Sequence, residues 1–342
     1  MHMADALLSP AIGGAMTAVS AVAIGYSVKK MAGDKLDEKK IPMMGVMGAF
    51  VFAAQMINFT IPGTGSSGHI GGGILLAALL GPFPGLISLA SVLLIQCLFF
   101  ADGGLLAYGC NVFNMGVIAC LLAYRFLYVP IIRRGMNKKN IALASVISVV
   151  IGLQLGAFCV VLETLASGVA ELPFGAFVAL MQPIHLAIGA VEGLVTAAVL
   201  CFVHSVRPEI LGSSPEGEKM SSGISMKKVL IVFLVLTVLV GGVLSLFASA
   251  YPDGLEWSME GVAGTAELER EGGAYDAMSR VVDSTAFMPD YGFAGDSEGS
   301  PFGTATAGVV GSAITIALAS GIGFILNAVR KKSGKTASPA DS

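Results

Sequence analysis

The sequence predicts an all-α integral membrane protein, with a seven-helix bundle plus two additional transmembrane helices that flank a small extracytoplasmic loop region. Three observations predict this fold. Of the 342 residues, 55% are hydrophobic and only 13% are charged, whereas soluble domains carry about 25% charged residues. Apolar stretches near the length of about 20 residues that crosses a bilayer recur along the chain. Lysines and arginines gather between alternate stretches, as they do in short cytoplasmic loops.

Nine apolar segments are candidate membrane spans. The third is too short to cross comfortably alone. Gly81-Pro82 separates it from the fourth, so these two segments could form a tight helical pair or a re-entrant unit. In chain order the candidates are residues 8–28, 42–60, 69–81, 83–100, 105–124, 141–167, 174–205, 228–250 and 305–329.

The basic residues test the number of crossings. Cytoplasmic loops carry an excess of lysine and arginine. If the amino terminus lies outside and the chain crosses nine times, every basic residue except Arg270 and Arg280 falls on the inner side. Because one span more or less would scramble this pattern, we predict nine crossings with the amino terminus outside. The inner clusters lie within residues 29–40, 125–139, 207–228 and 330–335.

Composition divides the chain into two membrane units. Residues 1–205 hold the first seven segments, and residues 206–227 have the Gly, Ser and Pro content of a cytoplasmic linker. The second unit, 228–329, has two spans on either side of the outer loop 251–303, and residues 330–342 form a cytoplasmic tail. The outer loop has 11 acidic and two basic residues. It is too short for a stable independent domain, so we expect it to pack on the membrane part.

The amino terminus carries candidate metal ligands. No basic residue precedes Lys29, whereas a signal peptide begins with a positive region, so we expect Met1 and His2 to be retained outside. A histidine at position two can offer the terminal amine, its own backbone nitrogen and an imidazole nitrogen in one plane. Planar nitrogen ligation is typical of Ni²⁺ and Cu²⁺, and a fourth nitrogen would complete it. The alternative is a disordered terminus on the surface.

The stretch PGTGSSGHIGGG, residues 62–73, could supply that fourth nitrogen. Its glycines spell a dinucleotide fingerprint, but the segment before it is a membrane span rather than the required strand, so we reject a nucleotide site. The predicted topology puts His69 on the same side as His2. Glycines could fold this loop inward toward His2, since irregular backbone is tolerated at membrane depth where it lines a cavity. The alternative is a tight turn whose His69 faces water.

Other residues suggest a different class of function. His185 and Glu192 are seven residues apart on one helix face. Ionisable residues inside a membrane are candidates for function, although hydrogen bonding between helices explains them equally well. The alternative function is therefore a stand-alone cation channel or secondary carrier that uses these two residues.

Several functions are excluded by missing motifs. The sequence has no H-E-x-x-H or C-x-x-C-H motif, so we expect no enzyme. The tail sequence SGKT at 333–336 ends like a nucleotide-binding loop, but Val329 stands where that loop needs glycine. Any ATPase would therefore be a separate chain. No basic face predicts nucleic-acid binding.

Five blocks, in the family's order over most of residues 1–205, resemble the cobalt/nickel substrate-specific component of energy-coupling factor transporters. They are MHMADALLSP, GVMGAFVFAAQMINF, GTGSSGHIGGGILLAALLGP, DGGLLAYGCNVFNMG and HLAIGAVEGLVT. The segment YPDGLEW at 251–257 resembles the small two-span companion subunit of these transporters, here fused to the first unit.

The resemblance implies a metal site open to the outside. In the family the metal is held by the amino terminus, by the backbone and imidazole nitrogens of the second residue, and by a histidine after the second span. Carried over, the ligands are Met1, His2 and His69. Because ligating imidazoles usually have outer hydrogen-bond partners, we add three supporting residues as an expectation, namely Asn58, Ser66 and Ser67.

The resemblance also implies partners and location. The chain would import Co²⁺ or Ni²⁺ across a prokaryotic inner membrane, with a transmembrane coupling protein and two cytoplasmic ATPase subunits. No cofactor is expected, since the metal is the transported ligand, and imported cobalt would serve cobalamin biosynthesis. The start of the chain departs from the family pattern Met-His-Ile-Pro-Asp-Gly-Phe at positions 3, 4, 6 and 7. Both metals therefore stay open.

Overall fold

The computed structural model describes residues 1–33, 40–211, 225–266, 268–293, 295 and 300–336. This part of the chain is nearly all helical, which confirms the predicted fold class. Seven of its helices are long and apolar enough to cross a membrane. They are α1 (Pro10–Gly33), α4 (Pro82–Phe100), the continuous helix Tyr108–Ile132, α7 (Lys138–Ser167), α8 (Phe174–Val206), α9 (Met226–Gly242, extended by a 3₁₀ turn to Phe247) and α12 (Pro301–Thr336).

The remaining elements are short. The helix Tyr108–Ile132 consists of α5 (Tyr108–Asn111), a wider π-helical stretch (Val112–Tyr128) and α6 (Val129–Ile132). A hairpin of β1 (Phe59–Ile61) and β2 (Ser66–Gly68) follows α2 (Lys40–Gln55). Two short helices, α10 (Gly254–Ala263) and α11 (Ala274–Thr285), lie within the loop between α9 and α12. Further 3₁₀ turns cover Asp5–Leu7, Pro208–Ile210 and Pro289–Tyr291.

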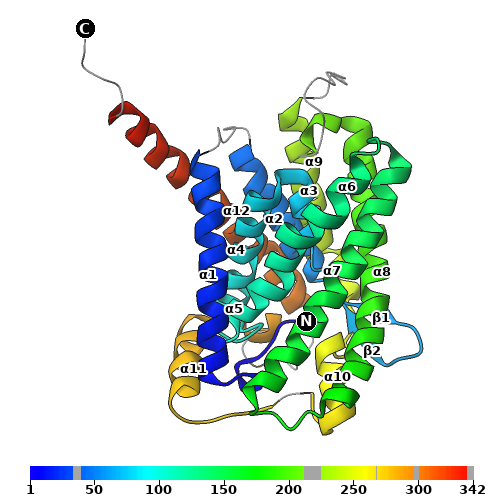
Figure 1. Ribbon diagram of the computed structural model, residues 1–342, viewed down its shortest axis with the longest axis vertical. Helices are drawn as coiled ribbons and strands as arrows, with labels where there is room; N and C mark the ends of the chain where they lie inside the picture. Colours follow the sequence, from blue (N-terminus) through cyan, green and yellow to red (C-terminus); the bar gives the residue numbers. More distant parts are fainter. Residues whose placement is uncertain (34–39, 212–224, 267, 294, 296–299, 337–342) are drawn as a thin grey trace.

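The third predicted span is a half-helix. Helix α3 (Gly73–Leu80) has 8 residues, a rise of about 12 Å against an apolar thickness of about 30 Å. It therefore does not cross a bilayer alone. Irregular chain from the hairpin to Gly72 precedes it, and Gly81, at φ +97°, turns it directly into α4. Helix α3 is buried along its whole length and packs against α2, α4 and the stretch Val112–Tyr128 (Figure 1). The number of nine crossings stays a prediction.

The C-terminal helices pack on the first unit through α2. The Ser312 hydroxyl of α12 donates a hydrogen bond to the Ala49 carbonyl of α2, at 3.2 Å. Gly311 lies against the Phe52 ring, where a side chain would overlap it. Residues 212–224 of the predicted linker and 337–342 of the predicted tail lie outside the described residues. The described parts of the two units thus form a single helical assembly (Figure 1).

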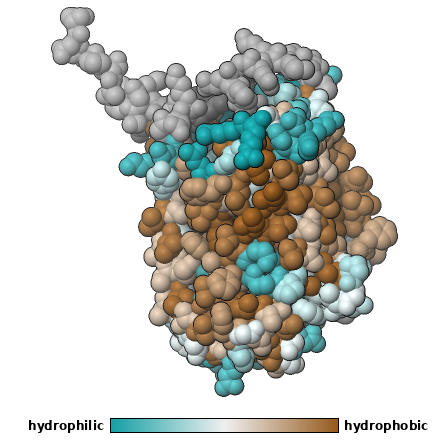
Figure 2. Space-filling view, turned by 45° about the vertical axis from the view of Figure 1, so that its right-hand side comes forward, coloured by the Kyte–Doolittle hydropathy of each residue, from teal (hydrophilic) through white to brown (hydrophobic). Residues whose placement is uncertain are grey.

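The loop between α9 and α12 packs over the amino-terminal segment. Arg270 donates from Nε to the Ala6 carbonyl at 3.0 Å, and the Tyr275 hydroxyl donates to the Leu8 carbonyl at 2.8 Å. Figure 1 shows α10, α11 and the β hairpin at the same end of the bundle. On the face that Figure 2 shows, hydrophobic residues cover much of the middle, and hydrophilic residues gather at the end opposite to this loop. One end of the molecule is therefore capped by this loop.

Candidate metal centre

The His69 loop is built from glycines and held by an acidic side chain. Gly68 packs so closely on α8 that a Cβ atom there would lie 2.5 Å from Ile188 Cγ1. Gly72 adopts a left-handed φ of +77°, which favours glycine. The Glu192 carboxylate accepts hydrogen bonds from the backbone nitrogens of Gly71 and Gly72, at 2.9 and 2.8 Å. Glu192 thus satisfies irregular backbone inside the bundle and fixes the chain that follows His69.

The amino terminus is ordered and buried. Met1 is 6% exposed and Met3 is fully buried. The Met3 backbone nitrogen donates to Asn111 Oδ1 at 2.7 Å, and the Asn111 side chain donates back to the Met3 carbonyl at 3.2 Å. The Ala107 backbone nitrogen donates to Asp5 Oδ1 at 2.9 Å. The alternative of a disordered surface terminus is therefore wrong.

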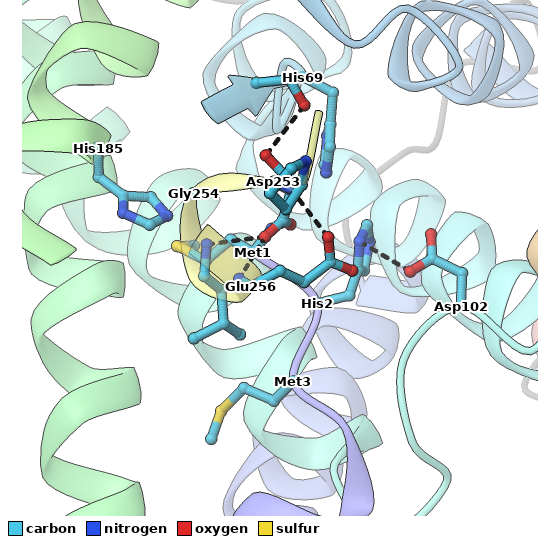
Figure 3. Close-up of polar contacts among 12 residues, drawn as sticks. Met1, His2, Met3, His69, Asp102, His185, Asp253, Gly254 and Glu256 are labelled. Atoms are coloured by element: carbon cyan, nitrogen blue, oxygen red, sulfur yellow. Dashed lines mark hydrogen bonds and ion pairs between the residues drawn. The ribbon is translucent and has the colours of Figure 1, made fainter. Parts of the chain in front are cut away.

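The fold brings His2 and His69 together. Their rings are stacked, with centroids 5.2 Å apart and planes inclined by 17°. Nδ1 of His2 lies 3.2 Å from Oδ1 of Asp102. Nδ1 of His69 lies 3.0 Å from the Ile70 carbonyl. Figure 3 shows the two rings side by side, with Asp102 beyond His2. His69 thus stacks on another histidine and is half-buried.

A further acidic residue, Asp253, comes from the second unit. Asp253 forms an ion pair with the amino group of Met1. Its other carboxylate oxygen caps α10, accepting from the backbone nitrogens of Leu255 and Glu256 at 2.7 and 3.0 Å. Glu256 closes a capping box by accepting from the Asp253 backbone nitrogen at 2.9 Å. The start of α10 therefore holds the Asp253 carboxylate against the amino terminus.

Electrostatics keep the histidines available as ligands. Burial, the neighbouring amino terminus and His2 together lower the pKa of His69 to about 4. Burial also lowers the pKa of His2, although Asp102 opposes this shift. Burial raises the pKa of Asp253, but the adjacent amino terminus, His69 and the Glu256 backbone nitrogen together outweigh burial and hold this pKa below its usual range. Both rings are thus neutral, with a nitrogen lone pair to offer, beside an ionised carboxylate.

A small cavity of about 10 Å³ lies beside Met1, His69 and Asp253, about the space that one water molecule needs. Met1, His69, His185 and Asp253 line it. His185 points in from α8 (Figure 3); its Nδ1 bonds the Met181 carbonyl at 2.8 Å. In the described part of the chain, no group of three His, Cys, Asp or Glu side chains could hold a metal ion. A metal here would need the nitrogens of the chain terminus.

The three expected supporting residues bond to the second unit and not to the His2 or His69 rings, among the contacts described. Ser67 donates from its backbone nitrogen to the Pro252 carbonyl at 2.8 Å and from its hydroxyl to the Tyr251 carbonyl at 2.7 Å. Ser66 also donates to the Pro252 carbonyl, at 3.3 Å. The Asn58 carbonyl accepts from the Ser249 backbone nitrogen at 2.7 Å. These contacts join the His69 hairpin to the segment that precedes Asp253.

Neither Asp102 nor Asp253 is predicted as a site residue from the sequence. Both stand in the quoted blocks that carry the family resemblance, DGGLL and YPDGLEW. An acidic residue in an outer loop is ordinarily solvated, so neither residue had a signal of its own. Their roles come from contacts across 100 and 252 positions of sequence, which only the fold brings about.

Comparison with known proteins gives concordant matches. Residues 2–210 match the family model described as the cobalt uptake substrate-specific transmembrane region, and residues 227–328 match the PDGLE domain. A putative fused nickel transport protein of Archaeoglobus fulgidus is 32% identical, over 93% of this chain and 96% of its own. A cobalt transport protein of Geobacter sulfurreducens is 29% identical over 71% of each chain. The crystal structure of a truncated transition metal transporter matches with a TM-score of 0.53 and 31% identity, over 60% of this chain and 99% of that chain.

Proposed function

Because this chain belongs to the cobalt uptake substrate-specific transmembrane family and continues into a PDGLE domain, we propose that it binds the Co²⁺ or Ni²⁺ that is imported. Relatives of this chain are described as nickel and cobalt transport proteins, which supports transport and not catalysis as its role. The observation that carries the proposed site is the approach of the His2 and His69 rings beside the buried amino group of Met1.

The ligands we propose are four nitrogens in a plane. Met1 supplies its amine, His2 supplies its backbone nitrogen and its Nδ1, and His69 supplies one ring nitrogen. Only Nδ1 of His2 can close a six-membered chelate ring with the His2 backbone nitrogen. Since Nδ1 now faces Asp102, metal binding includes a rotation of the His2 ring about its Cβ–Cγ bond. A planar nitrogen set favours Ni²⁺ over metals that prefer oxygen.

Charge balance supports a role for Asp253 at this site. A divalent ion on a neutral amine, two neutral imidazoles and one deprotonated backbone nitrogen leaves a net charge of one positive unit. A buried charge is costly unless it is paired. The Asp253 carboxylate beside the Met1 amino group would neutralise it. The second unit would thus take part in metal binding.

We also propose the type of transporter to which this chain belongs. The family resemblance supports an energy-coupling factor system, in which a transmembrane coupling protein and two ATPase subunits drive release of the metal inward. The outer loop of the second unit packs on the amino terminus and on the His69 hairpin. This packing supports a single fused unit for metal capture.

Extending the amino terminus tests the proposed ligands. We expect two alanines added before Met1 to abolish tight Co²⁺ and Ni²⁺ binding to the purified full chain, measured by calorimetry. Two residues are needed, because one would place the histidine third from the terminus, where an amine, two amides and an imidazole again form a planar nitrogen site. The unextended chain is the control. Unchanged affinity in the extended chain would contradict the ligand set.

A further inference from the structure

A second cavity lies directly behind the first. It measures about 20 Å³, and Asn114, Ser148 and Glu192 are its polar lining. Gly71, Met115 and Leu153 line both cavities, so the two share a wall and lie next to one another. Along α8, Glu192 of this second cavity is seven residues beyond His185 of the first, a rise of about 10 Å. The second cavity therefore lies deeper in the bundle.

The polar residues that line the second cavity each carry oxygen atoms, and two of these oxygens are unsatisfied. Ser148 is fully buried and Asn114 is 2% exposed. Ser148 Oγ and Asn114 Oδ1 are buried and have no hydrogen-bond partner within the described residues. Buried polar atoms of this kind ordinarily have a partner. Both oxygens are therefore available to coordinate a ligand in the cavity.

The third oxygen group is a carboxylate. Glu192 is 4% exposed, and its two oxygens accept from the backbone nitrogens of Gly71 and Gly72. Each carboxylate oxygen has a second lone pair. Amide donors compensate part of the cost of burial but leave the negative charge in place. A carboxylate inside a membrane is expensive and marks ion pathways, so the chemistry of the lining favours a cation.

We propose that this oxygen-lined cavity is a second, transient site for the divalent cation, which passes it inward after leaving the nitrogen site. The inference rests on the proposed function, since the first site supplies the ion. Carboxylate, amide and hydroxyl oxygens bind Co²⁺ and Ni²⁺ more weakly than planar nitrogens do. A weak site next to a tight one lets the ion leave, as conduction requires.

A thiol placed in the second cavity would trap the passing ion. In the full-length variant Ser148→Cys, the introduced thiol is nearly isosteric with the hydroxyl, and a coordinating thiol is deprotonated outright. We expect Ni²⁺ added beyond one equivalent to produce thiolate-to-nickel charge-transfer absorption above that of the wild type. Ser145→Cys is the matched control, because Ser145 is on the same helix, is equally buried and bonds its own helix at Ile141.

Three outcomes are decisive. New absorption in Ser148→Cys but not in Ser145→Cys supports the second site. One equivalent of Ni²⁺ bound with no new absorption overturns it and leaves a water-filled cavity, while the proposed function stands. Failure of the wild-type chain to bind even one equivalent overturns the proposed function as well. As a second measurement, Ser148→Ala should keep the Ni²⁺ affinity within about twofold and slow uptake about tenfold, and unchanged uptake would contradict the proposal.

Discussion

Replacing His69 with alanine is expected to weaken Ni²⁺ and Co²⁺ binding by more than about 100-fold, beyond the range typical of residues that only support a ligand. The imidazole is the fourth nitrogen of the proposed plane, and no nearby side chain takes its place without moving. The ring bonds only its neighbour's carbonyl, that of Ile70, among the contacts described. The fold should therefore survive the change. Calorimetric titration of the purified full chain measures the effect.

His204→Ala is the control for this prediction. His204 lies near the end of α8 that is remote from His185 and the cavity, so its loss should leave the metal affinity unchanged. Thermal unfolding should show similar midpoints for both variants. Equal affinities of His69→Ala and wild type would remove His69 from the ligand set.

Asp253→Asn is expected to weaken metal binding about 10–100-fold, the range for partners outside the ligand set. The carboxylate holds the Met1 amino group and balances the charge of the bound ion. Asparagine caps a helix about as well as aspartate does, so α10 should keep its start and the bonds to Leu255 and Glu256. The change thus isolates the negative charge. The measurement is again titration of the full chain with Ni²⁺.

An exposed carboxylate of the same loop serves as the matched control. Asp283 lies on α11 and is exposed to solvent, so Asp283→Asn alters the charge of the acidic loop equally without touching the terminus. Its affinity should remain within about twofold of the wild type, since exposed charges are screened. If both variants lose affinity equally, the loop acts through its overall charge and Asp253 has no special role.

The helical membrane fold could be predicted because apolar length is read directly from sequence. Long segments such as Lys138–Ser167 and Phe174–Val206 need no tertiary information to be recognised as spans. The third segment is different, since its irregular chain at Gly71 and Gly72 is stabilised by Glu192 of a distant helix. Such compensation between helices leaves no local pattern. The sequence therefore predicted that the third segment is too short to cross comfortably alone, but not that Glu192 stabilises the irregular chain before it.

The candidate site was predictable only where its ligands leave a local pattern in the sequence. A histidine beside the amino terminus has its chelating nitrogens within one residue, so His2 carries a local signal. His69 joined it through the predicted topology and the family resemblance. Asp102 and Asp253 are acidic residues of loops, and only the folded chain brings them to His2 and Met1. Charge partners supplied by long-range contacts are what sequence reasoning misses here.

The central claim is that nitrogens of Met1, His2 and His69 bind one ion in a plane. X-ray absorption at the nickel edge of the full chain loaded with one equivalent of Ni²⁺ tests it most directly. The account predicts four nitrogen ligands, with the pre-edge feature of square-planar Ni²⁺ and backscattering from two imidazoles, one of which disappears in His69→Ala. A six-coordinate shell dominated by oxygen, unchanged in His69→Ala, would contradict it.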